Sequence, residues 1–168
     1  GYKTAWLAES HLSSEVQKGN AKPVIPHWQG EVGLMTDFLQ VAQRIFARTE
    51  QIECGSAIMN ILCNGGPIAA AERIAAFANL HGIEPEEKRR IHVGFSGGRF
   101  EFMNRPFGIY PRDAVEEAAW PALKGLVFRE AALIFTRLLR GDTLSSKDSR
   151  RTVLTRATFR SDADWEAV

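Results

Sequence analysis

Cysteine is scarce in this sequence: Cys54 and Cys63 are the two among 168 residues. They lie nine positions apart, on one predicted strand and its exit, and an extended segment holds such residues too far apart for a disulfide. We therefore expect two free thiols, as is usual in a reducing compartment. The four histidines show no metal-ligand spacing, and two cysteines on one strand do not form a zinc site. The sequence thus predicts no metal centre.

An excess of charge of one sign is lacking as well. The 21 basic and 20 acidic residues leave a formal net charge of +1, so nothing calls for a polyanionic partner and we expect no nucleic acid. Short basic runs at Lys88–Arg90 and Lys147–Arg151 are typical of a solvated face. No apolar run reaches the length of a membrane span, and the first residues show no basic-then-apolar signal pattern. We therefore expect no membrane partner and, by default, a cytoplasmic protein.

What the sequence does contain is enough apolar residues for one core. Of its residues, 45% are hydrophobic and 24% are charged, as in an ordinary globular domain. Predicted strands and helices alternate along the chain. The expected strands are Thr4–Ala8, Ile52–Leu62 and Ile91–Phe95. The expected helices are Val32–Thr49, Pro67–His81 and a long last one that ends at Leu139.

Some of these elements carry more specific expectations. Strand Ile52–Leu62 is apolar without alternation, as in a strand covered on both faces. Asp113 can cap the last helix, and Pro121 either kinks that helix or starts a second one. The tail Asp142–Val168 is polar and expected to be irregular, with one short strand at Thr152–Phe159.

The alternation predicts the α/β class, with parallel strands and right-handed crossovers. Because a complete eight-stranded barrel takes about 250 residues, the chain is either an open domain of a few strands or part of a larger TIM barrel. Ligands bind at the carboxyl ends of parallel strands. The predicted functional edge is therefore Glu9–His11, Cys54–Pro67 and Phe95–Phe102.

Motifs at this edge leave alternatives open. His11 can act as acid, base or hydrogen-bond donor, or can simply bond its own loop. The small residues of Gly55–Ile58 admit a flat ligand or reflect tight packing. Asn64–Pro67 offers backbone N–H groups to an anion or forms an ordinary turn, and it is not a P-loop. Gly94–Gly98 has the letters of a hydrolase elbow, but no helix follows directly, so we do not expect a serine hydrolase.

Two passages are similar to segments of one known family. Gly1–His11 reads Gly-Tyr-Lys-Thr-Ala-Trp-Leu-Ala-Glu-Ser-His, and Ala47–Ala57 reads Ala-Arg-Thr-Glu-Gln-Ile-Glu-Cys-Gly-Ser-Ala. Both resemble the bacterial luciferase-like flavin-dependent monooxygenases, and the second match is the more specific. The similarity continues through Pro67–Ala78, Ile91–Gly98, Phe107–Ile109 and Leu138–Gly141.

The resemblance implies a TIM barrel of which this chain forms the second to fourth strands. It places the family's first strand before Gly1 and its last four strands after Val168. In that family, reduced FMN or the deazaflavin F420 lies across the carboxyl ends of these strands. Many of the contacts to the cofactor's phosphate come from the other half of the barrel. This chain by itself is thus expected to hold a flavin weakly or not at all.

The resemblance also implies roles for single residues. His11 corresponds to the second histidine of a family pair in which Ser10 replaces the first, and Ser96 falls near the reactive edge of the flavin ring. His11 and Ser96 are the predicted catalytic residues. The predicted cofactor-binding residues are Ser56, Ala57, Ile58, Ser96 and Gly97, of which the first three fall where family members often have a non-prolyl cis peptide.

The implied activity is a monooxygenation in which reduced flavin and oxygen act on an organic substrate, while the protein supplies position and a dry cavity. The other implied partners are a flavin reductase and a second copy of the chain, as a homodimer. Four aromatic residues are expected in the core or the cavity wall, and the core is favoured for the first two: Trp6, Phe95, Phe100 and Phe107. The loop Leu12–Gln29, with His27 and Trp28 at its tip, is expected to cover the substrate.

Two alternatives stay open. An F420-dependent dehydrogenase or reductase transfers hydride on the same scaffold without oxygen, and nothing in these residues separates it from a monooxygenase. A non-catalytic half-barrel module would pair with another chain and bind no flavin, and Ser10 in place of a family histidine favours it.

Overall fold

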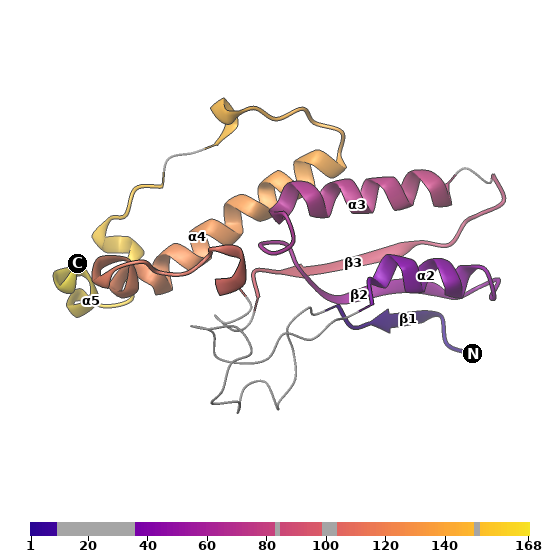
Figure 1. Ribbon diagram of the computed structural model, residues 1–168, viewed down its shortest axis with the longest axis horizontal. Helices are drawn as coiled ribbons and strands as arrows, with labels where there is room; N and C mark the ends of the chain where they lie inside the picture. The colour runs from indigo at the N-terminus through magenta and orange to yellow at the C-terminus, as the bar shows by residue number, and fades with distance from the viewer. Residues whose placement is uncertain (10–35, 83–84, 99–103, 150–151) are drawn as a thin grey trace.

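The computed structural model describes residues 1–9, 36–82, 85–98, 104–149 and 152–168, arranged as in Figure 1. The described chain has an α/β structure in which strands and helices alternate, as predicted. Its strands are Thr4–Leu7 (β1), Glu53–Asn60 (β2) and Ile91–Ser96 (β3). Its helices are Phe38–Phe46 (α2), Gly66–His81 (α3), Ala114–Leu139 (α4) and Asp162–Ala167 (α5), with 3-10 turns at Arg105–Phe107 (η2), Ser146–Asp148 (η3) and Arg156–Thr158 (η4).

The strands form one parallel sheet in the order β1-β2-β3. Leu7 pairs with Ser56, and Ser56 pairs with Val93, so the three strand exits lie at one edge of the sheet. This register confirms the prediction of co-directional neighbouring strands. The pairing of β2 with β3 shifts between Ser56 and Met59, and the Ala57–Ile58 peptide bond within this shift is cis, at the position that the family resemblance indicates.

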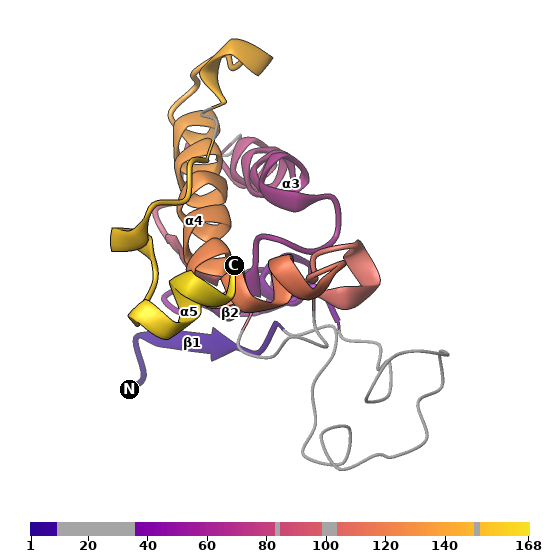
Figure 2. The same cartoon turned by 90° about the vertical axis from the view of Figure 1, so that its left-hand side faces the viewer.

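Helices cover one face of the sheet and form the core with it. Figures 1 and 2 show α3 and α4 on the same side of the strands, and α2 packs against β2. Helix α2 begins at Phe38 because Asp37 Oδ1 accepts hydrogen bonds from the backbone N–H groups of the first turn. Phe95 packs against the core, as expected. The core residues are Phe38, Leu39, Met59, Ile61, Leu62, Ala70, Ala71, Ile74, Ala131 and Phe135.

The other face of the sheet carries Trp6, Gly55 and His92 in one row. A ring carbon of Trp6 lies 2.5 Å from the position that a Cβ atom on Gly55 would take, so the indole packs on this glycine. Trp6 is nevertheless 60% exposed. Ile58 is 54% exposed. The predictions that Trp6 is a core residue and that β2 is covered on both faces are therefore wrong for the described chain. The reason is that the described helices pack on one face, although parallel sheets are usually buried on both.

Helix α4 runs without interruption through Pro121. Asp113 caps it, as predicted, by accepting a hydrogen bond from the Glu116 N–H at 2.8 Å. Figure 2 shows the helix bent near its start, as expected where a proline removes a backbone hydrogen bond. The bend confirms the kink and not a second helix.

The strand predicted at Thr152–Phe159 is wrong. The segment contains the 3-10 turn η4, and Thr155 forms a capping box with Thr158. Such local side-chain hydrogen bonds compete with strand formation. The tail is also less irregular than expected, because η3 and α5 lie in it. Both cysteines are free, as predicted, and the structure also shows that both are buried.

Candidate functional site

A buried polar network ties the exits of β2 and β3 together. Asn60, the last residue of β2, donates from Nδ2 to Asn104 Oδ1 at 2.9 Å. Asn104 is 1% exposed and donates from its own Nδ2 to the Gly97 carbonyl at 2.9 Å. Asn60 Oδ1 accepts from the Leu62 N–H at 3.1 Å. Each of the two side-chain amides thus donates a hydrogen bond from its nitrogen and accepts one at its oxygen. The network fixes the chain where the strands end.

Cys63 belongs to the same network but is poorly suited to nucleophilic chemistry. Its Sγ lies 2.9 Å from Asn60 Nδ2 and 3.5 Å from Asn104 Oδ1. Burial raises the pKa of the Cys63 thiol to about 12, and burial also raises the pKa of Cys54. Because the thiolate is the reactive form, the geometry assigns both cysteines to packing.

Ser96, a predicted catalytic residue, lies at the end of β3. Its carbonyl accepts a hydrogen bond from the Ile61 N–H at 3.0 Å, and its Oγ accepts one from the Gly98 N–H at 3.3 Å. The hydroxyl proton has no acceptor within the described part of the chain. Ser96 can therefore donate one hydrogen bond to a ligand at this edge.

The three predicted cofactor-binding residues of β2 differ in what they offer. Ser56 is buried, and its Oγ donates to the Gly94 carbonyl at 2.8 Å and accepts from the Gly94 N–H at 3.1 Å. The Ser56 hydroxyl is thus used inside the sheet, and it can act on a ligand only by holding the strand. Ala57 and Ile58 are exposed and present an apolar surface just before the exit of β2.

An ion cluster holds the exit of β1. Glu9 is 1% exposed, and its Oε1 accepts a hydrogen bond from Arg73 Nη2 at 3.0 Å. Arg73, on α3, also pairs with Asp37, the cap of α2. Burial raises the pKa of Glu9, and the interaction with Arg73 opposes this rise. Glu9 Oε2 is buried without a hydrogen-bond partner among the described residues.

Sequence reasoning missed Asn60, Arg73 and Asn104. Asn60 had a visible signal, since it is a polar residue at the end of an apolar strand. Arg73 and Asn104 had none, because their partners lie 64 and 44 positions away in the chain. Ser10 and His11 lie outside the described residues, as do Phe100 and the loop Leu12–Gln29, so their expected roles stay predictions.

A second pair of titratable groups lies at the opposite, amino end of the strands. His92 Nε2 is 2.7 Å from Glu53 Oε2, and this hydrogen bond lowers the pKa of Glu53. The His92 ring also lies beside Trp6, with ring centroids 5.9 Å apart. Because the strand exits are at the other end, this pair does not belong to the predicted edge.

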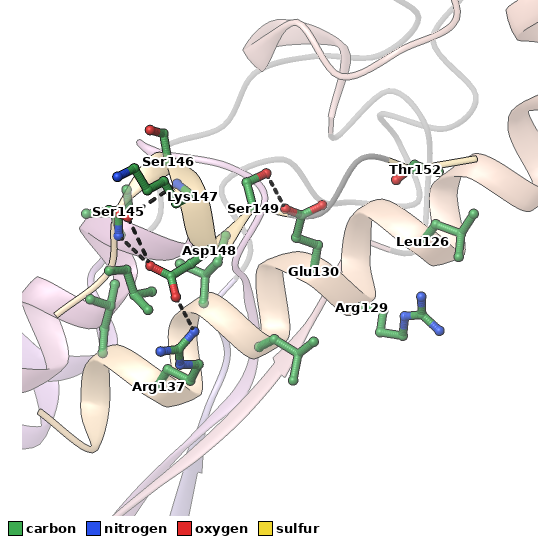
Figure 3. Close-up of a pocket in the computed structure, with 15 residues that line it drawn as sticks. Leu126, Arg129, Glu130, Arg137, Ser145, Ser146, Lys147, Asp148, Ser149 and Thr152 are labelled. Atoms are coloured by element: carbon green, nitrogen blue, oxygen red, sulfur yellow. Dashed lines mark hydrogen bonds and ion pairs between the residues drawn. The ribbon is translucent and has the colours of Figure 1, made fainter. Parts of the chain in front are cut away.

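A cavity of about 1020 Å³ lies between α4 and the residues Leu144–Ser149 and Thr152 (Figure 3). Its polar side chains bond mainly to one another. Arg137 pairs with Asp148 at 3.2 Å, and Glu130 accepts a hydrogen bond from the Ser149 hydroxyl at 2.8 Å. The strand exits do not line this cavity. A smaller cavity of about 300 Å³ adjoins the predicted edge, because Gly97 and Gly98 line it.

Comparisons with known proteins add no assignment, because no family model and no curated protein matches this chain. Among the described residues, no cluster of His, Cys, Asp and Glu is suited to hold a metal ion. No helix in the described ranges is both long and apolar enough to cross a bilayer. The geometry of the sheet edge therefore carries the functional argument.

Proposed function

We propose that this chain is part of a flavin-dependent oxidoreductase, a luciferase-like monooxygenase in which reduced flavin and oxygen act on an organic substrate. The observation that carries the proposal is that three parallel strands end at one sheet edge, which is where α/β folds bind ligands. At that edge the apolar surface of Ala57 and Ile58 lies one strand from the Ser96 hydroxyl. The family resemblance assigns these same residues to the flavin.

The uncovered sheet face supports a larger barrel. Trp6 is 60% exposed on that face, and within the described chain β1 and β3 each have one neighbouring strand. Closure of a TIM barrel would bury Trp6 and give both edge strands a second neighbour. We therefore propose that β1, β2 and β3 are consecutive strands of such a barrel.

The edge fits the ring of a flavin better than its phosphate. Ile58 offers apolar contact to the face of a flat ring, and Ser96 offers one hydrogen-bond donor to a ring heteroatom. Arg73 is a poor phosphate ligand because Glu9 and Asp37 already neutralise it. The residues of this edge would therefore orient the ring, and a phosphate would need other groups.

In this function the chain supplies position rather than reactive groups. Bound reduced flavin supplies the electrons for the reaction with oxygen. Ile58 holds the face of the ring, and Ser96 fixes the ring's rotation by a hydrogen bond. Asn60 and Asn104 keep both strand exits in place, so that the ring and the substrate meet in a constant geometry.

The test is the affinity of the full-length natural protein for FMN, measured by quenching of flavin fluorescence. Ile58→Arg places a charge on the exposed surface of β2, and we expect it to weaken FMN binding by at least about tenfold, which is about 1.4 kcal/mol. Leu80→Arg is the matched control, since Leu80 is equally apolar and 68% exposed but lies at the far end of α3.

The same titration separates the alternatives. Tighter binding of F420 than of FMN would indicate the dehydrogenase or reductase. Failure of the full-length wild type to bind either cofactor would contradict the proposal and favour the non-catalytic half-barrel. Equal affinities for FMN in Ile58→Arg and Leu80→Arg would show that the flavin lies elsewhere.

A further inference from the structure

Two cations from separate elements line the small cavity at the exit of β3. Lys124 belongs to α4, and Arg160 lies just before α5. They share the cavity with Gly97, Gly98 and Phe128. The described lining contains no aspartate or glutamate, so its charged side chains are both cationic.

Neither cation is neutralised by a carboxylate among the described residues. Other arginines of the chain are neutralised: Arg73 pairs with Glu9 and Asp37, Arg89 with Glu87, and Arg137 with Asp142 and Asp148. Like charges held at one cavity repel each other. The electrostatic free energy of this site therefore falls when an anion enters.

The fold brings both cations to the strand exit. Phe128 lies four residues after Lys124, hence on the same side of α4. Its ring packs on Gly97, 3.0 Å from where a Cβ atom would be, and lies 6.4 Å from the Phe95 ring. Helix α5 packs against α4, and Figure 2 shows the C-terminal segment beside the start of that helix. This contact carries Arg160 to the cavity.

We propose that this cavity binds a compact oxyanion, the carboxylate or phosphate group of the organic substrate. A guanidinium and an ammonium both form charge-assisted hydrogen bonds with such groups. The volume of about 300 Å³ is at the small end for ligand sites, and it has room for an acidic group together with the carbon atoms next to it. Phe128 offers apolar contact to the carbon atoms beside it. The assignment to the substrate rests on the proposed function, whereas the anion site itself does not.

The first experiment tests the anion site with benzoate, titrated into the full-length natural protein and followed by calorimetry. We expect saturable binding that weakens by about tenfold or more in Lys124→Gln and in Arg160→Gln, because each variant removes a charge-assisted hydrogen bond. Lys147→Gln and Arg140→Gln are matched controls, because both residues are exposed cations outside this cavity, and they should bind as the wild type does. Benzamide, the neutral analogue, should bind at least about tenfold more weakly than benzoate. Equal binding of benzamide, or equal affinities in all four variants, would overturn the proposal.

A second experiment identifies the source of the oxyanion. FMN carries a phosphate and riboflavin does not, so the ratio of their affinities reports on the phosphate site. We expect Lys124→Gln to leave this ratio unchanged, because the substrate and not the flavin occupies the cavity. A fall of the ratio toward one would assign the cavity to the cofactor's phosphate and overturn the assignment to the substrate. Absence of all flavin binding beside intact benzoate binding would remove the proposed function and with it the assignment to the substrate, and leave the anion site standing.

Discussion

At the scale of single residues, the contacts of a side chain decide its role at this edge more than its chemical type does. Ser56 and Ser96 are serines of neighbouring strands, but the Ser56 hydroxyl both donates a hydrogen bond to the Gly94 carbonyl and accepts one from the Gly94 N–H. The Ser96 Oγ accepts a hydrogen bond from the Gly98 N–H, and its proton has no acceptor among the described residues. Cys63 is a thiol held in an amide network and not a nucleophile.

A methyl group at Gly98 should disturb the polar network at the exit of β3. Its φ is +80°, and a Cβ atom there would lie 2.6 Å from Asn60 Nδ2 and 2.9 Å from Asn104 Oδ1. We expect Gly98→Ala to lower the free energy of unfolding by about 1–3 kcal/mol, as measured by urea denaturation. Gly125→Ala is the control, because nothing lies within 4 Å of its Cβ position in α4, and it should stabilise the chain by about 0.5–1 kcal/mol. Equal changes in the free energy of unfolding for Gly98→Ala and Gly125→Ala would contradict the close packing of the β3 exit.

The thiols should be inert in the folded chain. Because the pKa of Cys63 is raised to about 12, its thiolate fraction at pH 8 is on the order of one in ten thousand. We expect a disulfide reagent such as dithionitrobenzoate to label the native protein far more slowly than the protein in urea, where both cysteines react. Rapid labelling of two thiols without denaturant would contradict their burial.

At the scale of elements, the turn before β3 is held to α2 by Arg89. Its guanidinium pairs with Glu87, donates to the Phe46 carbonyl at 3.1 Å and lies 4.5 Å from the centre of the Phe46 ring. The hydrogen bonds from Arg89 lower the pKa of Glu87 to about 2. The cluster therefore fixes the amino end of β3, at the opposite end of the sheet from the strand exits.

This pKa shift predicts an acid-sensitive contribution to stability. Because the pKa of Glu87 is lower in the folded chain than its ordinary value of 4.5, its contribution is present above about pH 4.5 and is lost as the pH falls toward 2. We expect Glu87→Gln to destabilise the chain by about 1–3 kcal/mol at pH 7 and by much less at pH 2.5, in urea denaturation at both values. The exposed neighbour Glu86 provides the control variant Glu86→Gln. A pH-independent effect of Glu87→Gln would contradict the ion pair.

The elements themselves were largely predictable, because apolar periodicity and caps act over a few residues. Pro67 and Gly82 bound α3 nearly where expected, and Asp113 caps α4. The structure of 152–159 was not predictable in this way. The sequence favoured a strand there, but the capping box of Thr155 and Thr158 is a local alternative to β structure. At the edge, the position of Ser96 at a strand end follows from the sequence, whereas the exposure of Ile58 does not, because the apolar run of β2 predicted cover on both faces. The partners of Arg73 and Asn104 do not, since these contacts join distant segments.

At the scale of the whole molecule, the described helices cover one face of the three-stranded sheet. One sheet face is packed by α2, α3 and α4, while the other leaves Trp6 open. The apolar run of β2 predicted burial on both faces, and the composition of a strand cannot tell which chain segment supplies the second cover. The strand exits, in contrast, are already fixed by Asn60 and Asn104 within the described residues.

The most direct test of a flavin site at the carboxyl edge of the sheet is hydrogen–deuterium exchange of the full-length natural protein with and without FMN. Flavin binding at the carboxyl edge should protect the backbone amides of 57–61 and 96–98, and it should leave unchanged those at the amino ends of β2 and β3, around Glu53 and His92. Protection at the amino ends, or no change at 57–61 and 96–98 under saturating FMN, would contradict a flavin site built on these three strands.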